Sequence, residues 1–397
     1  MTERRLVGIS RGSGYVPRTA SGAALHLFDA LARRYRLEAR VDAELDRVQR
    51  VASLALAFHP VRNRWRDRYL NSPVGFALAS RNAGRRLSVP DAVAVQVYGM
   101  FRTSGAPYVM YLDSTQAMAI RHWKPWSPYG RPGRAAWMAM ERAAYRGAEH
   151  IFTAATPTAR SVVEDYGVPA ERVSVAGAGS NFFPLPAPRR RSHAPQILFM
   201  GREWERKGGP VLVRAFRRVR AELPEARLAI VGPELTLDEP GVEVVGRVRD
   251  REALAERFRA AAIYCVPSIF DPFTTSLMEG MAYSLPCVAS TTAGVPELVL
   301  DGQTGLLVEP GDEQGLAAAL LRLLRDPELG DRLGRAGRVR VEEELTWDRV
   351  AARMAPVLEG LGVVPLHEAI TASASITRPE HREVVKASAG GVDRVVT

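Results

Sequence analysis

Short apolar runs alternate with amphipathic stretches through the C-terminal half of the chain. The apolar runs end in glycine or a polar loop and lie at 196–201, 226–232, 241–248, 263–268, 285–290 and 304–312. The stretches between them with apolar residues at helical spacing are 209–223, 251–261, 275–283 and 313–326. Apolar strands that alternate with helices predict a parallel sheet covered on both faces, with ligands beyond the carboxyl ends of its strands.

The N-terminal half shows the same alternation less clearly. Its expected strands are 5–10, 37–42, 91–99, 107–113, 150–155 and 172–181, and its expected helices are 20–35 and 157–167. A chain of 397 residues exceeds what one core usually covers. We therefore expect an α/β protein with two Rossmann-like, doubly wound parallel-sheet domains, joined by the proline-rich and basic segment 184–195. The domains should cover 1–186 and 187–345, and the apolar-poor end, 363–397, should be mostly disordered.

Composition narrows the class of protein. The net charge is +10, yet only three of the 54 basic residues are lysines. So strong a preference for arginine over lysine indicates a general bias in composition, with most arginines solvated on the surface. We therefore expect no nucleic-acid partner. Apolar stretches stay below the roughly 20 residues of a membrane span, and the N-terminus lacks the apolar core of a signal peptide. Cys265 and Cys287 lie in apolar runs as inert thiols are expected to, and no metal-ligand spacing occurs. A cytoplasmic protein without disulfides is the economical interpretation.

A group of cations follows the first strand of the C-terminal half. The strand ends at Gly201, and the next loop carries Arg202, Arg206 and Lys207 before a helix begins. Cations at the carboxyl end of a parallel strand, beside a helix N-terminus, suit a phosphate or diphosphate. A solvated surface loop would look the same. Lys207 favours the first interpretation, because a chain that otherwise uses arginine keeps lysine here.

Two carboxylates flank another strand-to-helix junction. Asp271 follows the strand at 263–268, and Glu279 lies about two turns into the next helix. The backbone N–H groups near Thr274, Thr275 and Ser276 should be free to hold an anion. Cations, free N–H groups and carboxylates together fit a nucleotide-sugar, since carboxylates accept hydrogen bonds from vicinal hydroxyls. The alternative is that Asp271 caps the helix and Glu279 is solvated.

These motifs carry a resemblance to a known family. The segments GREWERKGG, AIVG, VVGRV and VPSIFDPFTTSLMEGMAYSLPCVASTTAGVPELVLDGQTGLLVEPGD, within 196–326, resemble the C-terminal domain of family-4 type retaining glycosyltransferases of the GT-B fold. The resemblance implies that Asp271 holds hydroxyls of the donor sugar and Glu279 holds the ribose. It implies that Arg202 and Lys207 bind the diphosphate and that the backbone around Val248 meets the base.

The N-terminal half resembles the family more loosely. The resemblance implies two domains facing across a cleft, a loop at Gly12–Gly14 near the phosphates and Asp113 facing the reacting sugar. The segment LTWDRVAARM would begin a helix, 346–362, that crosses back onto the first domain. The chain departs from the family pattern by having Asp rather than Glu at 271, Thr274 where glycine is usual and Leu112 where histidine often precedes the aspartate.

The resemblance also implies a reaction without a metal or other cofactor, since no D-x-D motif is present and cations can stabilise the leaving diphosphate. The donor would be a nucleotide-sugar, most commonly of UDP, and the acceptor a hydroxyl of unknown identity. A non-catalytic nucleotide-sugar-binding subunit and a sugar-nucleotide epimerase remain alternatives. The segments 58–69 and 121–137 mix arginine with aromatic residues. This mixture indicates either a peripheral contact with an anionic membrane or only the chain's general preference for arginine over lysine.

Overall fold

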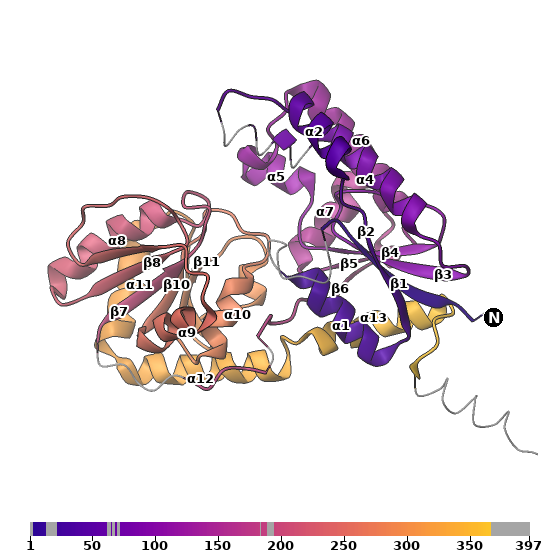
Figure 1. Cartoon of the computed structure of the whole chain (residues 1–397). Coiled ribbons are helices and arrows are strands. Elements are labelled where there is room, and N and C mark those ends of the chain that lie inside the picture. The colour runs from indigo at the N-terminus through magenta and orange to yellow at the C-terminus, as the bar shows by residue number, and fades with distance from the viewer. Residues whose placement is uncertain are drawn as a thin grey trace, which may run out of the picture.

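The computed structural model describes residues 3–12, 22–61, 65, 68–69, 72–182, 184–188 and 194–366. Two parallel six-stranded sheets, each flanked by helices, form the molecule (Figure 1). Most of the expected disordered tail, from 367 on, and most of the arginine-rich part of the expected linker lie outside the described residues. The tail prediction was wrong at its start, because Val363 is buried and pairs with Arg4.

The N-terminal sheet has the strand order β2-β1-β3-β4-β5-β6. Every residue of its central strands β3 and β4 is buried, which is why these runs are apolar without alternation. The strands are β1 (Arg5–Ser10), β2 (Leu37–Asp42), β3 (Ala92–Val97), β4 (Tyr108–Leu112), β5 (His150–Thr153) and β6 (Val173–Val175). The helices are α1 (Ala23–Arg34), α2 (Arg47–Leu56), α4 (Pro73–Arg86), α5 (Gln116–His122), α6 (Arg131–Gly147) and α7 (Thr156–Tyr166).

The C-terminal sheet has the order β12-β11-β10-β7-β8-β9, and every predicted strand and helix of this half is present. Cys265 and Cys287 are free and buried, and burial raises the pKa of both thiols. The strands are β7 (Gln196–Met200), β8 (Arg227–Val231), β9 (Val242–Gly246), β10 (Ile263–Val266), β11 (Cys287–Ser290) and β12 (Gly305–Val308). The helices are α8 (Gly209–Glu222), α9 (Arg251–Ala260), α10 (Thr275–Ala282) and α11 (Glu313–Arg325).

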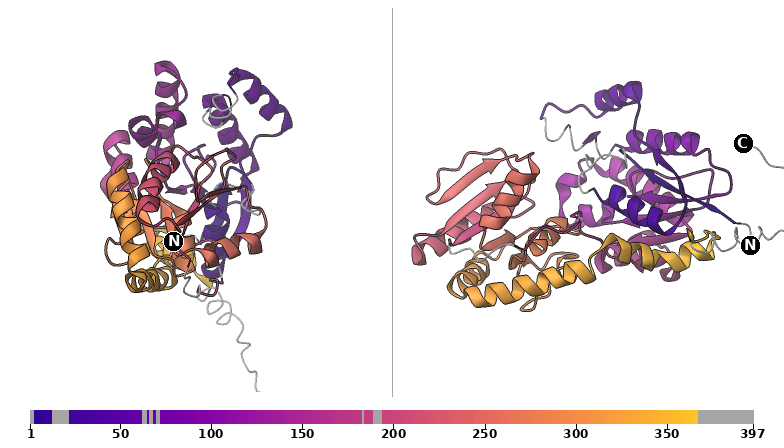
Figure 2. Two further views of the ribbon diagram at one scale, coloured as in Figure 1. Left: turned by 90° about the vertical axis from the view of Figure 1, so that its left-hand side faces the viewer. Right: turned by 60° about the horizontal axis from the view of Figure 1, so that its bottom comes forward.

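The last two helices connect the halves. Helix α12 (Pro327–Glu343) packs on α10, and α13 (Trp347–Gly360) packs on α1 of the other half. Figures 1 and 2 show them running one after the other beneath both sheets. Thr346 caps α13, and Trp347 and Met354 lie in the apolar core of the N-terminal half. The chain thus returns to the N-terminal half as the resemblance implied.

Each sheet reverses its strand order at one place. In the C-terminal sheet this place lies between β7 and β10, because β8 and β9 extend one way from β7 while β11 and β12 extend the other way from β10. In the N-terminal sheet it lies between β1 and β3. Crevices at such positions, beyond the carboxyl ends of the strands, are where open α/β sheets bind ligands.

Candidate functional site

The loop after β7 carries the cations at the reversal point of the C-terminal sheet. Gly208 ends this loop with φ +77°, and a Cβ there would lie 1.8 Å from the carbonyl oxygen of Pro267, just after β10. Only glycine can therefore bring the loop so close to the neighbouring strand end. This approach places Lys207 against Asp271, which follows β10, and joins the two motifs that the sequence showed separately.

Asp271 is the centre of a buried charge cluster. Its carboxylate forms an ion pair with Lys207 and lies 3.3 Å from Nη1 of Arg206. Arg206 also donates to the carbonyl of Phe270 at 3.0 Å and to the Glu203 carboxylate at 2.9 and 3.0 Å. Burial alone would raise the pKa of Asp271, but the charges of Lys207 and Arg206 lower it. Asp271 is therefore anionic, and part of the positive charge beside it is already neutralised.

The segment after α5, in the N-terminal half, reaches this cluster. The indole N–H of Trp126 donates to Glu203 at 3.0 Å, and the Arg206 guanidinium lies 4.5 Å from the centre of the Trp126 ring. His122, at the end of α5, stacks on Phe270 with ring centres 5.3 Å apart. These contacts hold the loop after β7 against the other half of the molecule, so the two halves meet at the charge cluster.

Glu279 lies on α10, partly buried beside the same cations. Burial raises its pKa to about 7, while the charges of Lys207 and Arg251 oppose that rise. Arg251 is the first residue of α9, which follows β9. Burial lowers the pKa of His26 on α1, and the charge of Arg251 contributes a smaller lowering. The prediction that Glu279 and Lys207 share one site is consistent with this placement.

The start of α10 differs in part from the expectation. Thr274 is buried and precedes the helix with φ −84°, which is open to any residue, so the usual glycine is not required for the backbone there. The N–H of Thr275 donates to the carbonyl of Phe273 at 3.1 Å. The expectation that this N–H is free was therefore wrong. The predicted anion-binding role is left to the N–H groups of Thr274 and Ser276.

Asp113 follows β4 and faces the cluster from the N-terminal half. Burial raises the pKa of its carboxyl, a hydrogen bond from Ser114 at 3.2 Å lowers it, and the charge of Asp271 raises it further. The two aspartates are thus close enough for the charge of one to affect the pKa of the other. Gly12, after β1, has φ +90° and its N–H donates to Asp42 at 3.0 Å, whereas Gly14 lies outside the described residues.

The remaining predicted residues lie at the same edge of the C-terminal sheet. Gly201 follows β7, and the exposed Arg202 is next to it. Val248 follows the edge strand β9 and packs on the core beneath α10. Among the residues that the structure describes, no group of three or more His, Cys, Asp or Glu side chains could hold a metal. The expectation of a reaction without a cofactor stays a prediction.

Sequence reasoning assigned no role to Glu203 or Arg251. It counted Arg206 only among the loop cations suited to a phosphate, and Trp126 only within the segment 121–137 considered for membrane contact. Glu203 and Arg206 carry a local signal, because opposite charges three residues apart can pair along a turn. Trp126 carries none, because its partners come from the other half of the chain. The only sequence signal for Arg251 is its position at the start of the helix that follows β9.

Residues 194–326 match the family described as "Glycosyl transferases group 1". The D-inositol 3-phosphate glycosyltransferase of Thermobispora bispora is 35% identical over 240 residues, which are 53% of this chain and 55% of that protein. The chain thus spans about half the length of the curated relatives it matches.

Solved structures share the arrangement of both halves. A sucrose-phosphate synthase of Thermosynechococcus elongatus superposes with a TM-score of 0.65 at 20% identity, over 93% of this chain and all of that one. HepE of Anabaena, solved with UDP, superposes with a TM-score of 0.59 at 17% identity, over 90% of this chain and all of that one. These likenesses show that the chain has the two-domain GT-B fold.

Proposed function

We propose, from the group 1 glycosyltransferase domain that residues 194–326 form, that this chain moves a sugar from a nucleoside-diphosphate sugar to a hydroxyl acceptor. The observation that carries the proposal is the buried cluster of Lys207, Arg206 and Asp271 at the strand reversal, beside Glu279 on α10. A diphosphate fits the cations, and vicinal hydroxyls fit the carboxylates. UDP is the first donor to test, since HepE was solved with UDP.

The proposed reaction retains the configuration of the sugar. The bond between the anomeric carbon and the donor phosphate oxygen breaks, and a bond from that carbon to the acceptor oxygen forms on the same face. The acceptor proton goes to the departing phosphate oxygen, so the products are a nucleoside diphosphate and a glycoside. Lys207, Arg206 and the N–H groups at the start of α10 stabilise the negative charge that develops on the leaving group.

The acceptor is a hydroxyl of a saccharide, a lipid-linked sugar or a small molecule. It would enter from the N-terminal half, where Asp113 faces the cluster. Contacts of Trp126 and His122 with the loop after β7 and with Phe270 bring the two halves together, and such closure orients the acceptor and limits water.

One feature favours a second function, which is nucleotide-sugar binding without transfer. Asp271 is one methylene shorter than the glutamate usual in the family, and Lys207 and Arg206 both engage it. A carboxylate held in this way reaches the sugar less easily. Tight donor binding with undetectable transfer and undetectable donor hydrolysis would support this second function.

Calorimetric titration of UDP, GDP and ADP tests the proposal. We expect one of the three to bind the wild-type protein, and Lys207→Ala to weaken that binding by about tenfold or more, because a charge-assisted contact to phosphate is lost. Arg332→Ala is the control for loss of one cation, since Arg332 is exposed on α12, away from the loop after β7. Failure of all three nucleotides to bind would refute the donor site and leave only the fold.

A further inference from the structure

Helix α2 of the N-terminal half carries its apolar face outward. Val48, Val51 and Leu56 are 78%, 62% and 69% exposed, and Phe58 and Val61, just beyond the helix, are 61% and 52% exposed. We name these five residues the apolar ridge. With about 3.6 residues per turn, the exposed Val48, Val51 and Leu56 fall within an arc of about 140° on the helix. Most of the exposed large apolar side chains found among the described residues lie in the ridge.

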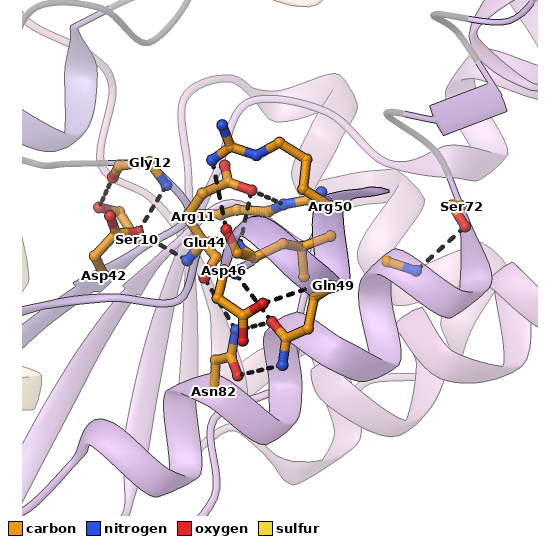
Figure 3. Close-up of polar contacts among 12 residues, drawn as sticks. Ser10, Arg11, Gly12, Asp42, Glu44, Asp46, Gln49, Arg50, Ser72 and Asn82 are labelled. Atoms are coloured by element: carbon orange, nitrogen blue, oxygen red, sulfur yellow. Dashed lines mark hydrogen bonds and ion pairs between the residues drawn. The ribbon is translucent and has the colours of Figure 1, made fainter. Parts of the chain in front are cut away.

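The polar side of α2 is the side that is fastened to the protein. Asp46 caps the helix and forms a capping box with Gln49. Gln49 exchanges hydrogen bonds of 3.1 and 2.8 Å with Asn82 of α4. Figure 3 shows the side chains of Asp46, Gln49 and Asn82. Ser53, on the same side of α2 as Gln49, is buried. An amphipathic helix normally turns its apolar stripe to the core. Here the hydrogen bonds fix the reverse orientation, so the exposed ridge is a built feature of the fold.

The charge around the ridge indicates what covers it. Arg47 and Arg50 are exposed on α2, and the segment 47–61 holds no acidic residue. Cations that flank an exposed apolar helical face are typical of a helix that lies in the interface of an anionic lipid surface. Helix α2 also projects from the body of the molecule, as the views in Figure 2 show, so a flat surface can approach it.

A second copy of this chain fits the ridge less well. A stable dimer uses about 20–30 residues on each side, several times the number in the ridge. Pairing two ridges would also bring Arg47 and Arg50 of each copy against like charges, in a protein whose net charge is already +10. Charge and size therefore both favour the lipid surface.

The structure also changes the sequence-based expectation of membrane contact. In 121–137, Trp137 is buried against Phe76, and Trp126 contacts Arg206 and Glu203. These two aromatic residues are therefore used within the protein. Of the other segment, 58–69, only part is described, and the described Phe58 and Val61 belong to the ridge. In the part of the chain that the structure covers, no helix is long and apolar enough to cross a membrane.

We propose that the apolar ridge and its two flanking arginines dock this protein onto an anionic lipid surface without spanning it. Helix α2 follows the carboxyl end of β2, at the same edge of the sheet as Gly12 and Asp113. Docking through the ridge would therefore bring the acceptor side of the molecule toward the lipid. Binding to lipid through this ridge does not depend on the transfer reaction, so the two proposals can fail separately.

Vesicle flotation with the full chain tests the docking. The vesicles contain phosphatidylglycerol and phosphatidylcholine in equal parts, or phosphatidylcholine alone, at about 0.15 M salt. We expect the wild-type protein to float with the anionic vesicles only. The combined variant Val48→Gln, Val51→Gln, Leu56→Gln should bind them at least about tenfold more weakly, because it removes the apolar contact. The double variant Arg47→Gln, Arg50→Gln should also lose binding.

Val339→Gln is the matched control, because Val339 is 48% exposed on α12, away from α2. It should float like the wild-type protein, and thermal melts should show that all variants are folded. Absence of wild-type flotation would overturn the proposal, as would undiminished flotation of the triple variant. A concentration-dependent dimer in gel filtration that the triple variant abolishes would assign the ridge to a second copy instead.

Discussion

Replacing Asp271 with asparagine should have opposite effects on stability and on nucleotide binding. The substitution keeps the size of the side chain and removes its negative charge. Arg206 and Lys207 then lose the anion that they share. A nucleoside diphosphate no longer has to compete with that carboxylate for the two cations, so its binding should become tighter while the free protein becomes less stable.

The size of the stability loss follows from burial. The Arg206 and Asp271 side chains are only 8% and 6% exposed, with 3.3 Å between Nη1 and Oδ2. Removing one partner of a buried ion pair costs about 3–5 kcal/mol, because the other charge stays buried. Arg206 keeps Glu203 as a second partner, so we expect the lower end, about 3 kcal/mol of the free energy of unfolding. The gain in diphosphate affinity should be at least about tenfold, or about 1.4 kcal/mol.

Urea unfolding and calorimetric titration of UDP measure the two effects. Glu313→Gln is the matched control, because Glu313 also pairs with two arginines, Arg214 and Arg218, but with a side chain 26% exposed. It should lose much less stability and bind UDP as the wild-type protein does. A stability loss no larger than that of the control, or weaker UDP binding by Asp271→Asn, would refute the reasoning that Asp271 competes with phosphate for the cations.

Two further predictions concern residues around this cluster. Trp126→Ala removes both the N–H bond to Glu203 and the ring over Arg206. Donor turnover should therefore fall by about tenfold or more while UDP affinity stays unchanged. Trp126→Phe should restore part of the turnover, and equal turnover in all three proteins would exclude a role of Trp126 in closure. Burial raises the pKa of Glu279 to about 7, and ribose hydroxyls donate hydrogen bonds best to its ionised form. The affinity for UDP-glucose should therefore rise between about pH 6 and about pH 8. UDP-glucose is the ligand to use because its phosphates do not titrate near neutrality. Glu279→Gln should show no such rise in a calorimetric pH series, and an unchanged slope would mean that another group titrates.

The pattern of apolar residues predicted the C-terminal half because its central strands, β10 and β11 above all, are buried on both faces. Such strands read as continuous apolar runs, and their order along the chain leads to the reversal point between β7 and β10. Helices α2, α4, α5, α6 and α12 were not predicted. For α2 and α12 the physical reason is clear. Helix α2 turns its apolar side to solvent, and Pro327 begins α12 although proline suggested only the end of the helix before it.

The candidate site was predictable as far as strand ends determine position. Lys207 and Asp271 both follow strands that prove to be neighbours, so their pairing could be anticipated from parallel topology. The contact of Trp126 with Arg206 and Glu203 could not, because it depends on how one domain sits against the other. No periodicity or spacing in a single sequence encodes that arrangement.

The pKa values of the two aspartates at the meeting point of the domains are shifted in opposite directions. Lys207 and Arg206 lower the pKa of Asp271 against the effect of burial, whereas burial and the charge of Asp271 raise the pKa of Asp113. Neighbouring carboxyl groups whose pKa values are pushed apart can act as an anion and as a proton-holding group. A diphosphate that binds Lys207 and Arg206 adds negative charge nearby and raises the pKa of Asp113 further. Donor binding should therefore shift the titration of Asp113 toward its protonated form, the direction that makes it a weaker base for the acceptor proton at a given pH. This direction agrees with the proposal that the departing phosphate oxygen takes that proton.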